Sequence, residues 1–343
     1  MGLRRRRSSE ELTASALQKI LMIRLDHLGD VVMSLPAAAR VRRAFPASQI
    51  DFLIPEIFEK LLTPFAAVHN LRLIAFHQNW FSRNPNPLEK RRESAAILHR
   101  LQKEKYDLGI DFRGDLRNIL LLYRAGIRFR AGYGATGGGF LLTHCPPYDR
   151  HAHPSVLSAR LLEALGISGP LEPVPLVQGL KNNSPRHEMK LGVSRLVIIH
   201  PGAAHAAKRW PAENFDALIL RIRKEKLAHV MIVGDEKEKK EIPLPGAEAL
   251  AGDGILDRRG LIPLHELAGE FSPAHLFVGN DSGPAHIAAA QGLPVISIFS
   301  DLNDPDAWKP WTPRLKLIAG AIRDIPVDTV FDAVKSELAK VSI

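Results

Sequence analysis

The sequence has little of what several protein classes require. It contains one cysteine, Cys145, so no internal disulfide can form and a reducing compartment is expected. No apolar run approaches the roughly 18 residues of a membrane-spanning helix. Aromatic residues make up 6% of the chain and its basic residues are dispersed, which argues against a nucleic-acid partner that stacks bases on aromatic rings. We expect a cytoplasmic protein.

The chain carries a net positive charge. The formal net charge of +9 favours an anionic partner such as a phosphate compound or an acidic membrane surface. Four consecutive arginines, residues 4–7, resemble the start of a signal peptide, but no apolar segment follows them. A capping pattern and a helix at residues 9–18 are expected instead. The arginines are either a solvated tail or a peripheral contact with the inner membrane surface.

Apolar strands alternate with helical segments along the whole chain, which predicts an α/β protein. Prolines interrupt this alternation near the middle. We therefore expect a first domain at residues 1–168, a linker at 169–187 and a second domain at 188–343. Strands are predicted at residues 20–25, 49–54, 71–76, 108–112, 196–200, 229–233 and 295–299, and the main helices at 31–45, 88–103, 155–165, 212–226 and 285–291.

Asp30 follows the first strand through a turn that contains one glycine, Gly29. A single glycine does not make the three-glycine dinucleotide fingerprint. The carboxylate either caps the next helix or serves as a general base at the carboxyl edge of a parallel sheet, where ligands usually bind. The residues alone leave both readings open.

Arg113 and Arg117 follow the strand at 108–112 and are four residues apart. Such a pair suits carboxylates or phosphates on a substrate, or else it is simply solvated. His153, before a predicted helix, is a further candidate for contact with an acceptor substrate, since no Cys/His set has zinc-site spacing. The glycine-rich segment 132–139 is expected to be a mobile loop and lacks the ending of a P-loop.

The second half carries a candidate anion site. Lys208 and Arg209 follow the strand at 196–200 and supply charge for a diphosphate, and Glu236 follows the next strand, where it either binds ribose hydroxyls or caps a helix. Residues 277–299 (FVGNDSGPAHIAAAQGLPVISIF) predict strand, tight loop, helix and strand. The helix start, with Ser282 and Gly283, offers free backbone N–H groups to a phosphate.

Three blocks in this order resemble the ADP-heptose:lipopolysaccharide heptosyltransferases, glycosyltransferase family 9. They are residues 23–32 (IRLDHLGDVV), 200–211 (HPGAAHAAKRWP) and 278–299 (VGNDSGPAHIAAAQGLPVISIF). The resemblance implies a GT-B fold, in which two Rossmann-like domains with parallel sheets face a central cleft. The N-terminal domain would bind the acceptor and the C-terminal domain the nucleotide sugar. The last helix is a candidate to pack back on the first domain.

The resemblance also implies roles for individual residues. Asp30 matches the catalytic base, Lys208 the lysine that contacts the diphosphate, and Glu236 the acidic ribose contact. The positions that match the donor-binding loop and helix start are Asp281, Ser282, Gly283 and His286. Where the family often has serine or threonine before its Gly-Asp pair, this chain has Asp26-His27-Leu28.

We therefore expect an inverting, metal-independent transfer of a heptose from ADP-heptose to a sugar hydroxyl of the anionic lipopolysaccharide inner core, with no cofactor. Asp304 and Asp306 flank a proline and are expected to form a turn rather than a metal site. The alternatives are a related transferase that uses another nucleotide sugar, or a nucleotide-sugar-binding protein without catalytic activity.

Overall fold

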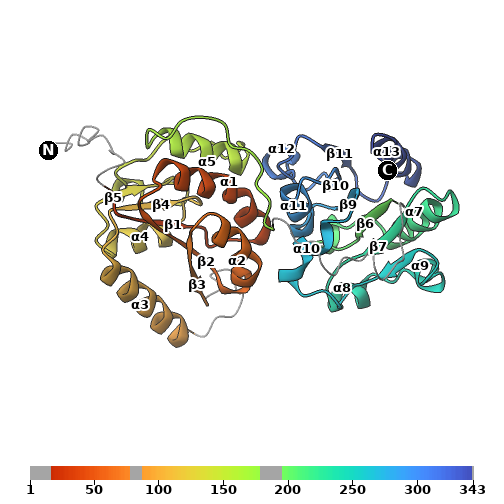
Figure 1. Ribbon diagram of the computed structural model, residues 1–343, viewed down its shortest axis with the longest axis horizontal. Coiled ribbons are helices and arrows are strands. Elements are labelled where there is room, and N and C mark those ends of the chain that lie inside the picture. Colours follow the sequence, from red (N-terminus) through yellow and green to blue (C-terminus); the bar gives the residue numbers. More distant parts are fainter. Residues whose placement is uncertain (1–16, 78–86, 178–194, 342–343) are drawn as a thin grey trace. The chain divides into compact units, whose positions relative to one another are not determined.

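The computed structural model describes residues 17–77, 87–177 and 195–341, and the chain forms two compact units, Met1–Glu172 and Pro173–Ile343 (Figure 1). The division falls inside the predicted linker 169–187, of which residues 178–187 lie outside the described part. The four arginines at 4–7 and nearly all of the predicted helix at 9–18 also lie outside it. Among the described helices, none combines the length and the apolar character that crossing a bilayer requires.

The first unit is a parallel five-stranded sheet of order β3-β2-β1-β4-β5 with helices on both faces (Figure 1). Its strands are almost wholly apolar because both faces are covered. Helices α3 and α4 cover one face, where Leu101 and Leu122 pack with Leu21 and Ile23, while α1 packs against α5. The elements are β1 (Lys19–Ile23), α1 (Leu28–Ala44), β2 (Gln49–Pro55), η1 (Glu56–Phe58), α2 (Glu59–Val68), β3 (Arg72–Phe76), α3 (Pro87–Glu104), β4 (Leu108–Asp111), α4 (Leu116–Arg124), β5 (Phe129–Ala131), η2 (Gly139–Leu141) and α5 (Pro154–Glu163).

The second unit is a parallel six-stranded sheet of order β11-β10-β9-β6-β7-β8. The predicted α/β class and its parallel sheets are thus confirmed in both units. The elements are β6 (Leu196–His200), η3 (Ala206–Lys208), α7 (Ala212–Lys224), β7 (His229–Ile232), α8 (Glu236–Glu241), α9 (Pro245–Ala249), β8 (Ile255–Asp257), η4 (Leu264–Glu266), α10 (Leu267–Phe271), β9 (Leu276–Asn280), α11 (Gly283–Ala290), β10 (Val295–Ser300), α12 (Pro305–Trp308), β11 (Leu315–Gly320) and α13 (Val327–Ala339).

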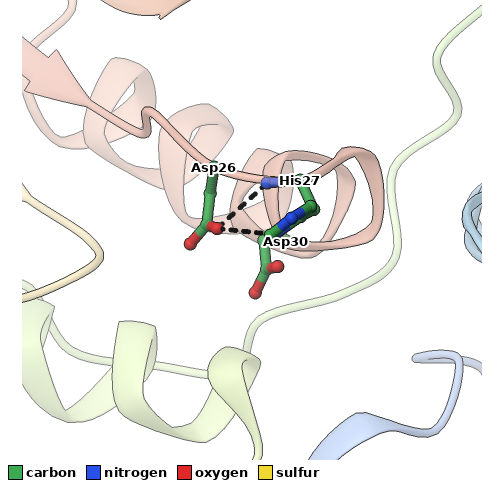
Figure 2. Close-up of side chains that lie close together, drawn as sticks. All are labelled: Asp26, His27 and Asp30. Atoms are coloured by element: carbon green, nitrogen blue, oxygen red, sulfur yellow. Dashed lines mark hydrogen bonds and ion pairs between the residues drawn. The ribbon is translucent and has the colours of Figure 1, made fainter. Parts of the chain in front are cut away.

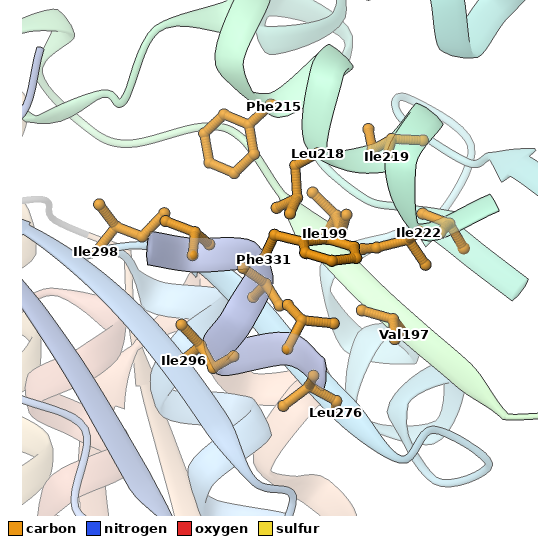
Figure 3. Close-up of a cluster of buried hydrophobic side chains, with 14 of the residues drawn as sticks. Val197, Ile199, Phe215, Leu218, Ile219, Ile222, Leu276, Ile296, Ile298 and Phe331 are labelled. Atoms are coloured by element: carbon orange, nitrogen blue, oxygen red, sulfur yellow. The ribbon is translucent and has the colours of Figure 1, made fainter. Parts of the chain in front are cut away.

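The last helix belongs to the core of its own unit. Phe331 of α13 lies fully buried among Ile199 of β6, Leu218 of α7 and Ile296 of β10 (Figure 3). Burying one such phenylalanine stabilises the fold by about 1.5–3 kcal/mol. The apolar face of α13 is therefore used within the second unit, and packing of this helix on the first domain stays a prediction.

Strand order fixes where ligands can bind. In the first sheet the chain proceeds from β1 to β2 and β3 on one side and later to β4 and β5 on the other, so the connections after β1 and β4 diverge. The same switch lies between β6 and β9 in the second sheet. Ligands of open parallel sheets bind at the carboxyl ends of the strands that flank such a switch. The residues that follow β1, β4, β6 and β9 are therefore the candidates for a ligand site.

Candidate functional site

A buried ion cluster follows β1. Nη2 of Arg24 lies 2.6 Å from Oδ1 of Asp30 and 3.4 Å from Oδ2 of Asp26. Nη1 of Arg24 donates to the backbone carbonyl of Phe112, the residue directly after β4. Arg24 thus ties the ends of the two switch-point strands together and places both carboxylates at the same edge of the sheet.

Asp30 does not cap helix α1. Helix α1 starts at Leu28 with His27 at the N-cap position, so Asp30 lies inside the first turn, where its carboxylate faces Arg24. Figure 2 shows Asp30 on this turn and Asp26 on the preceding loop, with Asp26 bonded to the backbone N–H of His27 at 3.0 Å and close to its ring at 3.2 Å. Of the two readings left open by the sequence, the helix cap is excluded.

The environments of the two carboxylates push their pKa values apart. Burial raises the pKa of Asp30, and the attraction of Arg24 only partly opposes this. Burial acts in the same direction on Asp26, but the hydrogen bond from His27 and the charges of Arg24 and Arg113 outweigh it and lower its pKa. Paired groups with separated pKa values suit a division of roles, with Asp26 as a fixed charge and Asp30 as the proton acceptor.

One set of side chains has the geometry of a metal site. Asp26, His27 and Asp30 each offer a ligand atom, and these atoms lie within 4.8 Å of one another, the only such trio in the parts of the chain that the structure describes. However, Arg24 and Arg113 already pair with the two carboxylates. A divalent cation would have to compete with both guanidinium groups, so the trio fits an ion-pair cluster better than a metal site.

The loop after β4 is organised by Asp111. This fully buried carboxylate accepts hydrogen bonds from the backbone N–H groups of Gly114 at 2.9 Å and Asp115 at 3.1 Å and from Nδ2 of Asn118 at 2.9 Å. Burial raises its pKa to about 6 against these bonds. Gly114 has φ +79°, and a Cβ there would lie 2.7 Å from the carbonyl oxygen of Tyr133, so only glycine fits.

This loop brings both predicted arginines to the site edge. Arg113 pairs with Asp26, and its Nε lies 3.4 Å from Asp115. Asp115 caps α4 by accepting from the backbone N–H of Arg117 and also binds the Arg117 guanidinium at 2.7 Å. Arg113 therefore joins the Asp30 cluster directly, whereas Arg117 is connected to it through Asp115.

His153 takes a structural position. It is the N-cap residue of α5, is 5% exposed, and its Nδ1 accepts a hydrogen bond from the backbone N–H of Ser155 at 3.2 Å. This contact holds the start of a helix that packs on α1. A role for His153 in binding an acceptor stays a prediction.

In the second unit, Lys208 and Asp281 meet across the switch point. Nζ of Lys208, which closes η3, lies 3.1 Å from Oδ2 of Asp281, which follows β9. Nδ2 of Asn303 donates to the same oxygen at 2.5 Å. Asn280 fixes the loop after β6 by donating to the carbonyl of Pro201 at 2.8 Å and accepting from the backbone of Trp210 at 3.0 Å. The two predicted donor-loop segments are thus held side by side.

Helix α11 begins without a side-chain cap. Ser282 is the N-cap residue, but its hydroxyl forms no cap bond and lies 3.0 Å from Nδ1 of His200, while Asp281 faces Lys208. Neither side chain therefore caps the helix. Pro284 in the first turn has no N–H, and the N–H of Ala285 bonds to the carbonyl of Ser282, so the backbone N–H groups that can bind an anion are those of Ser282 and Gly283.

The structure adds a carboxylate that sequence reasoning missed. Oε2 of Glu238 lies 3.2 Å from Nε2 of His200, so Glu238, His200 and Ser282 form a chain of contacts. Glu238 reaches His200 because two glycines leave room for it: a Cβ would lie 1.8 Å from its Oε1 at Gly202 and 2.9 Å from its Oε2 at Gly234. The D-x-x-E capping box that Asp235 and Glu238 form was the available signal.

The other predicted donor residues occupy more peripheral or more buried positions. Glu236 lies in the first turn of α8, and its exposed carboxylate pairs with Lys240 at 3.2 Å. Arg209 lies 2.8 Å from Glu241 and donates to the carbonyl of Ala203. His286 is buried in the first turns of α11. Of the acidic residues on α8, Glu238 rather than Glu236 contacts His200, which in turn contacts Ser282.

Comparison with known proteins places these features in one family. Residues 94–328 match the model of glycosyltransferase family 9 (heptosyltransferase). The chain is 26% identical over 322 residues to lipopolysaccharide heptosyltransferase 3 of Escherichia coli K12, covering 91% of each chain. It is also 26% identical over 294 residues to lipopolysaccharide heptosyltransferase 1 of Pseudomonas aeruginosa, covering 83% of this chain and 79% of that one.

Solved structures show the same fold. E. coli ADP-heptose LPS heptosyltransferase II superposes with a TM-score of 0.76 at 21% identity, covering 94% of this chain and 99% of that one. E. coli heptosyltransferase WaaC with ADP gives a TM-score of 0.75 at 19% identity, covering 93% and 100%. These matches confirm the predicted GT-B fold, and the family model spans more than half of the sequence. The chain therefore belongs to glycosyltransferase family 9, the heptosyltransferases.

Proposed function

We propose that this glycosyltransferase moves a heptose from ADP-heptose to a sugar hydroxyl of the lipopolysaccharide inner core. The observation that carries the proposal is Asp30, a buried carboxylate with a raised pKa at the switch point of the first sheet. The names of the relatives support the substrates, since they include lipopolysaccharide heptosyltransferases and a heptosyltransferase solved with ADP.

Asp30 acts as the general base in this proposal. A sugar hydroxyl is a poor nucleophile until a positioned carboxylate takes its proton in the transition state. The proton moves to a carboxylate oxygen of Asp30, the acceptor oxygen forms the new bond to the anomeric carbon, and the bond to ADP breaks. A single displacement of this kind inverts the anomeric configuration. In this proposal Arg113 and Arg117, which pair with Asp26 and Asp115 at the same edge, bind anionic groups of the acceptor.

The second unit stabilises the leaving ADP. Lys208 is placed to transfer its ion pair from Asp281 to the diphosphate, since Asn303 continues to bond Asp281 when Lys208 turns away. The open N–H groups at the start of α11 add fixed partial positive charge. The buried His286 and the peripheral Arg209 and Glu236 remain predicted donor contacts.

The transfer itself is the first test. The purified enzyme is incubated with ADP-heptose and, separately, with a heptose-free and a heptosylated inner-core acceptor, and the product is identified by mass spectrometry and by the anomeric coupling in its NMR spectrum. We expect a mass gain of one heptose with inverted configuration and stoichiometric release of ADP. ADP binding without any transfer to inner-core acceptors would contradict the proposal, as would a product with retained configuration.

We further propose that transfer needs no divalent metal. Lys208 and the start of α11 supply the positive charge for the leaving group, and Arg24 and Arg113 pair with the carboxylates of the Asp26–Asp30 trio. Exhaustive EDTA treatment is therefore expected to leave turnover unchanged on an acceptor analogue without phosphates. Activity that disappears with EDTA and returns only with a divalent ion would show that the trio, or another site, holds a metal.

The pH profile reports on the base. Asp30 must be ionised to accept a proton, so kcat/KM should fall as the pH decreases through its pKa. An ordinary aspartate has a pKa of about 4. Because burial raises the pKa of Asp30, the acidic limb of the profile should lie above that pH. The measurement is the initial rate at subsaturating acceptor across acidic and neutral buffers. An acidic limb at or below the usual aspartate value would argue against a raised pKa at the base.

A further inference from the structure

An apolar surface is exposed on the first unit. It consists of Leu116, Leu120 and Tyr123 on α4, which are 37%, 39% and 52% exposed, and Phe140 in η2, which is 88% exposed. We call these four side chains the α4 surface. Single exposed apolar residues are ordinary, whereas a contiguous group of large ones marks an interaction site.

Local geometry explains why the four side chains gather. Leu116, Leu120 and Tyr123 are spaced i, i+4 and i+7, so they share one face of α4, while Leu122 lies in the core on the opposite face. The η2 turn packs against α4. Gly138, with φ +78°, allows this contact, since a Cβ there would lie 2.7 Å from Cδ1 of Leu116. The turn therefore brings Phe140 to the same helix.

The border of the α4 surface is positively charged. Between Asp115 and Asp149 the sequence contains four arginines and no further acidic residue, and one of these arginines, Arg117, pairs with Asp115. Two of them, Arg124 and Arg128, are exposed, and the guanidinium of Arg130 lies 5.6 Å from the ring centroid of Tyr123. Apolar side chains surrounded by arginine match the interface of an anionic bilayer, where the side chains enter the acyl boundary and the guanidinium groups meet lipid phosphates.

The α4 surface also adjoins the proposed acceptor edge. Helix α4 begins at Asp115, which binds Arg113, and Arg113 pairs with Asp26 in the Asp30 cluster. The helix then runs back over the face of the sheet, so its first turn, with Leu116, is the part of the α4 surface nearest to the edge at which the acceptor hydroxyl would react. A protein bound to a bilayer through α4 would hold this edge close to the lipid surface.

We propose that the α4 surface docks the enzyme on an anionic lipid bilayer. This rests on the proposed function for its biological purpose, since an inner-core acceptor carries a lipid anchor, but the binding itself depends only on the surface. A second copy of the chain is a poorer occupant, because a two-fold contact would bring the two sets of arginines together. A nucleic acid would pair with the arginines and leave Leu120 and Phe140 in water.

The test measures binding of the full chain to vesicles by co-sedimentation. Wild-type protein is expected to bind vesicles of mixed phosphatidylglycerol and phosphatidylcholine and to bind pure phosphatidylcholine far less. The apolar double variant Leu120→Gln/Phe140→Ser should bind the mixed vesicles at least about tenfold more weakly, the factor that corresponds to 1.4 kcal/mol. Its matched control is Ile57→Ser/Val68→Gln, which changes two exposed apolar residues elsewhere in the same unit.

A double arginine substitution tests the charged border of the α4 surface separately. Arg124→Gln/Arg128→Gln should weaken binding to the mixed vesicles, with Arg43→Gln/Lys60→Gln as the control that removes equal charge from other exposed positions of the unit. Every protein in the series keeps the arginines at 4–7, so a difference between variant and control belongs to the α4 surface. Melting temperatures should agree within each pair.

Activity separates this proposal from the proposed function. On an acceptor analogue without lipid, the four variants should match the wild type, whereas on acceptor embedded in mixed vesicles the α4 variants should be slower than their controls. Wild-type protein that fails to bind mixed vesicles, or variants that bind no worse than their controls, would overturn the docking proposal. So would a self-associating wild type that becomes monomeric in the apolar variant. Absence of transfer to both acceptors would instead count against the proposed function.

Discussion

Asp30→Asn is expected to lower turnover about 10²-fold or more, the contribution that a general base commonly makes. Asparagine keeps the size of the side chain but cannot accept the hydroxyl proton. The measurement is steady-state release of ADP in the presence of saturating acceptor, with ADP affinity determined by calorimetry. Affinity for ADP should stay the same, because Asp30 lies in the first unit and the proposed phosphate contacts lie in the second.

The stability of the Asp30→Asn protein provides an internal control. A carboxylate whose pKa is raised by burial is less stable ionised in the folded protein than in water, so its removal should not lower the melting temperature at neutral pH. Arg24 keeps Asp26 as a partner. Asp149→Asn, which changes an exposed aspartate of the same unit, is the matched variant. Turnover close to that of Asp149→Asn would remove Asp30 from its role as base.

Lys208→Ala should weaken ADP binding by about 1.5–3 kcal/mol, roughly 10- to 150-fold, which is the range of a hydrogen bond to a charged group. Calorimetry with ADP and with adenosine separates the phosphate contribution, since adenosine should bind equally to both proteins. Asn303 remains to bond Asp281 in the variant, so the loop after β9 should keep its conformation.

A second lysine of the same unit makes the comparison specific. Lys335→Ala removes an exposed positive charge on α13 and should leave the affinity for ADP unchanged. Equal losses of adenosine and ADP affinity in Lys208→Ala would mean that Lys208 supports the loop rather than the diphosphate. Equal losses of ADP affinity in the two variants would mean that the change in net charge, rather than a contact made by Lys208, weakens binding.

The sequence predicted the architecture well because strong local signals coincide with it. Strands buried on both faces are nearly all apolar, and β6 was predicted at its observed bounds. Shorter or irregular elements were missed. β5 and β8 have three residues each, and α2 follows a 3-10 turn and contains Pro64. Such segments carry too few residues, or too weak a period, to stand out from a loop.

Partners within the site were the least predictable part. Asp30 and Lys208 stood out because each lies near the end of an apolar strand in a family-like block. Arg24 did not, because its position inside a predicted strand says nothing about which carboxylates it will meet. Glu238 lies 38 positions from His200, and their contact exists only because the sheet places β6 beside β7. Contacts of this kind follow from strand order, which the sequence pattern does not specify.

The position of Ser282 determines which atoms can recognise an anion. Burial opposes ionisation of Glu238, but the hydrogen bond and charge of His200 outweigh it and keep the pKa of Glu238 low. The His200 ring joins the two groups, with Oε2 of Glu238 3.2 Å from its Nε2 and the Ser282 hydroxyl oxygen 3.0 Å from its Nδ1. The Ser282 hydroxyl is thus engaged by His200 and forms no cap bond at the start of α11.

In the proposed function, recognition of the diphosphate at the start of α11 therefore falls to main-chain N–H groups, which every residue except proline supplies. Side chains around such a site can be exchanged during evolution without removing its hydrogen-bond donors, provided that the turn keeps its shape. At such a site the path of the backbone supplies the donors, whichever side chains surround it.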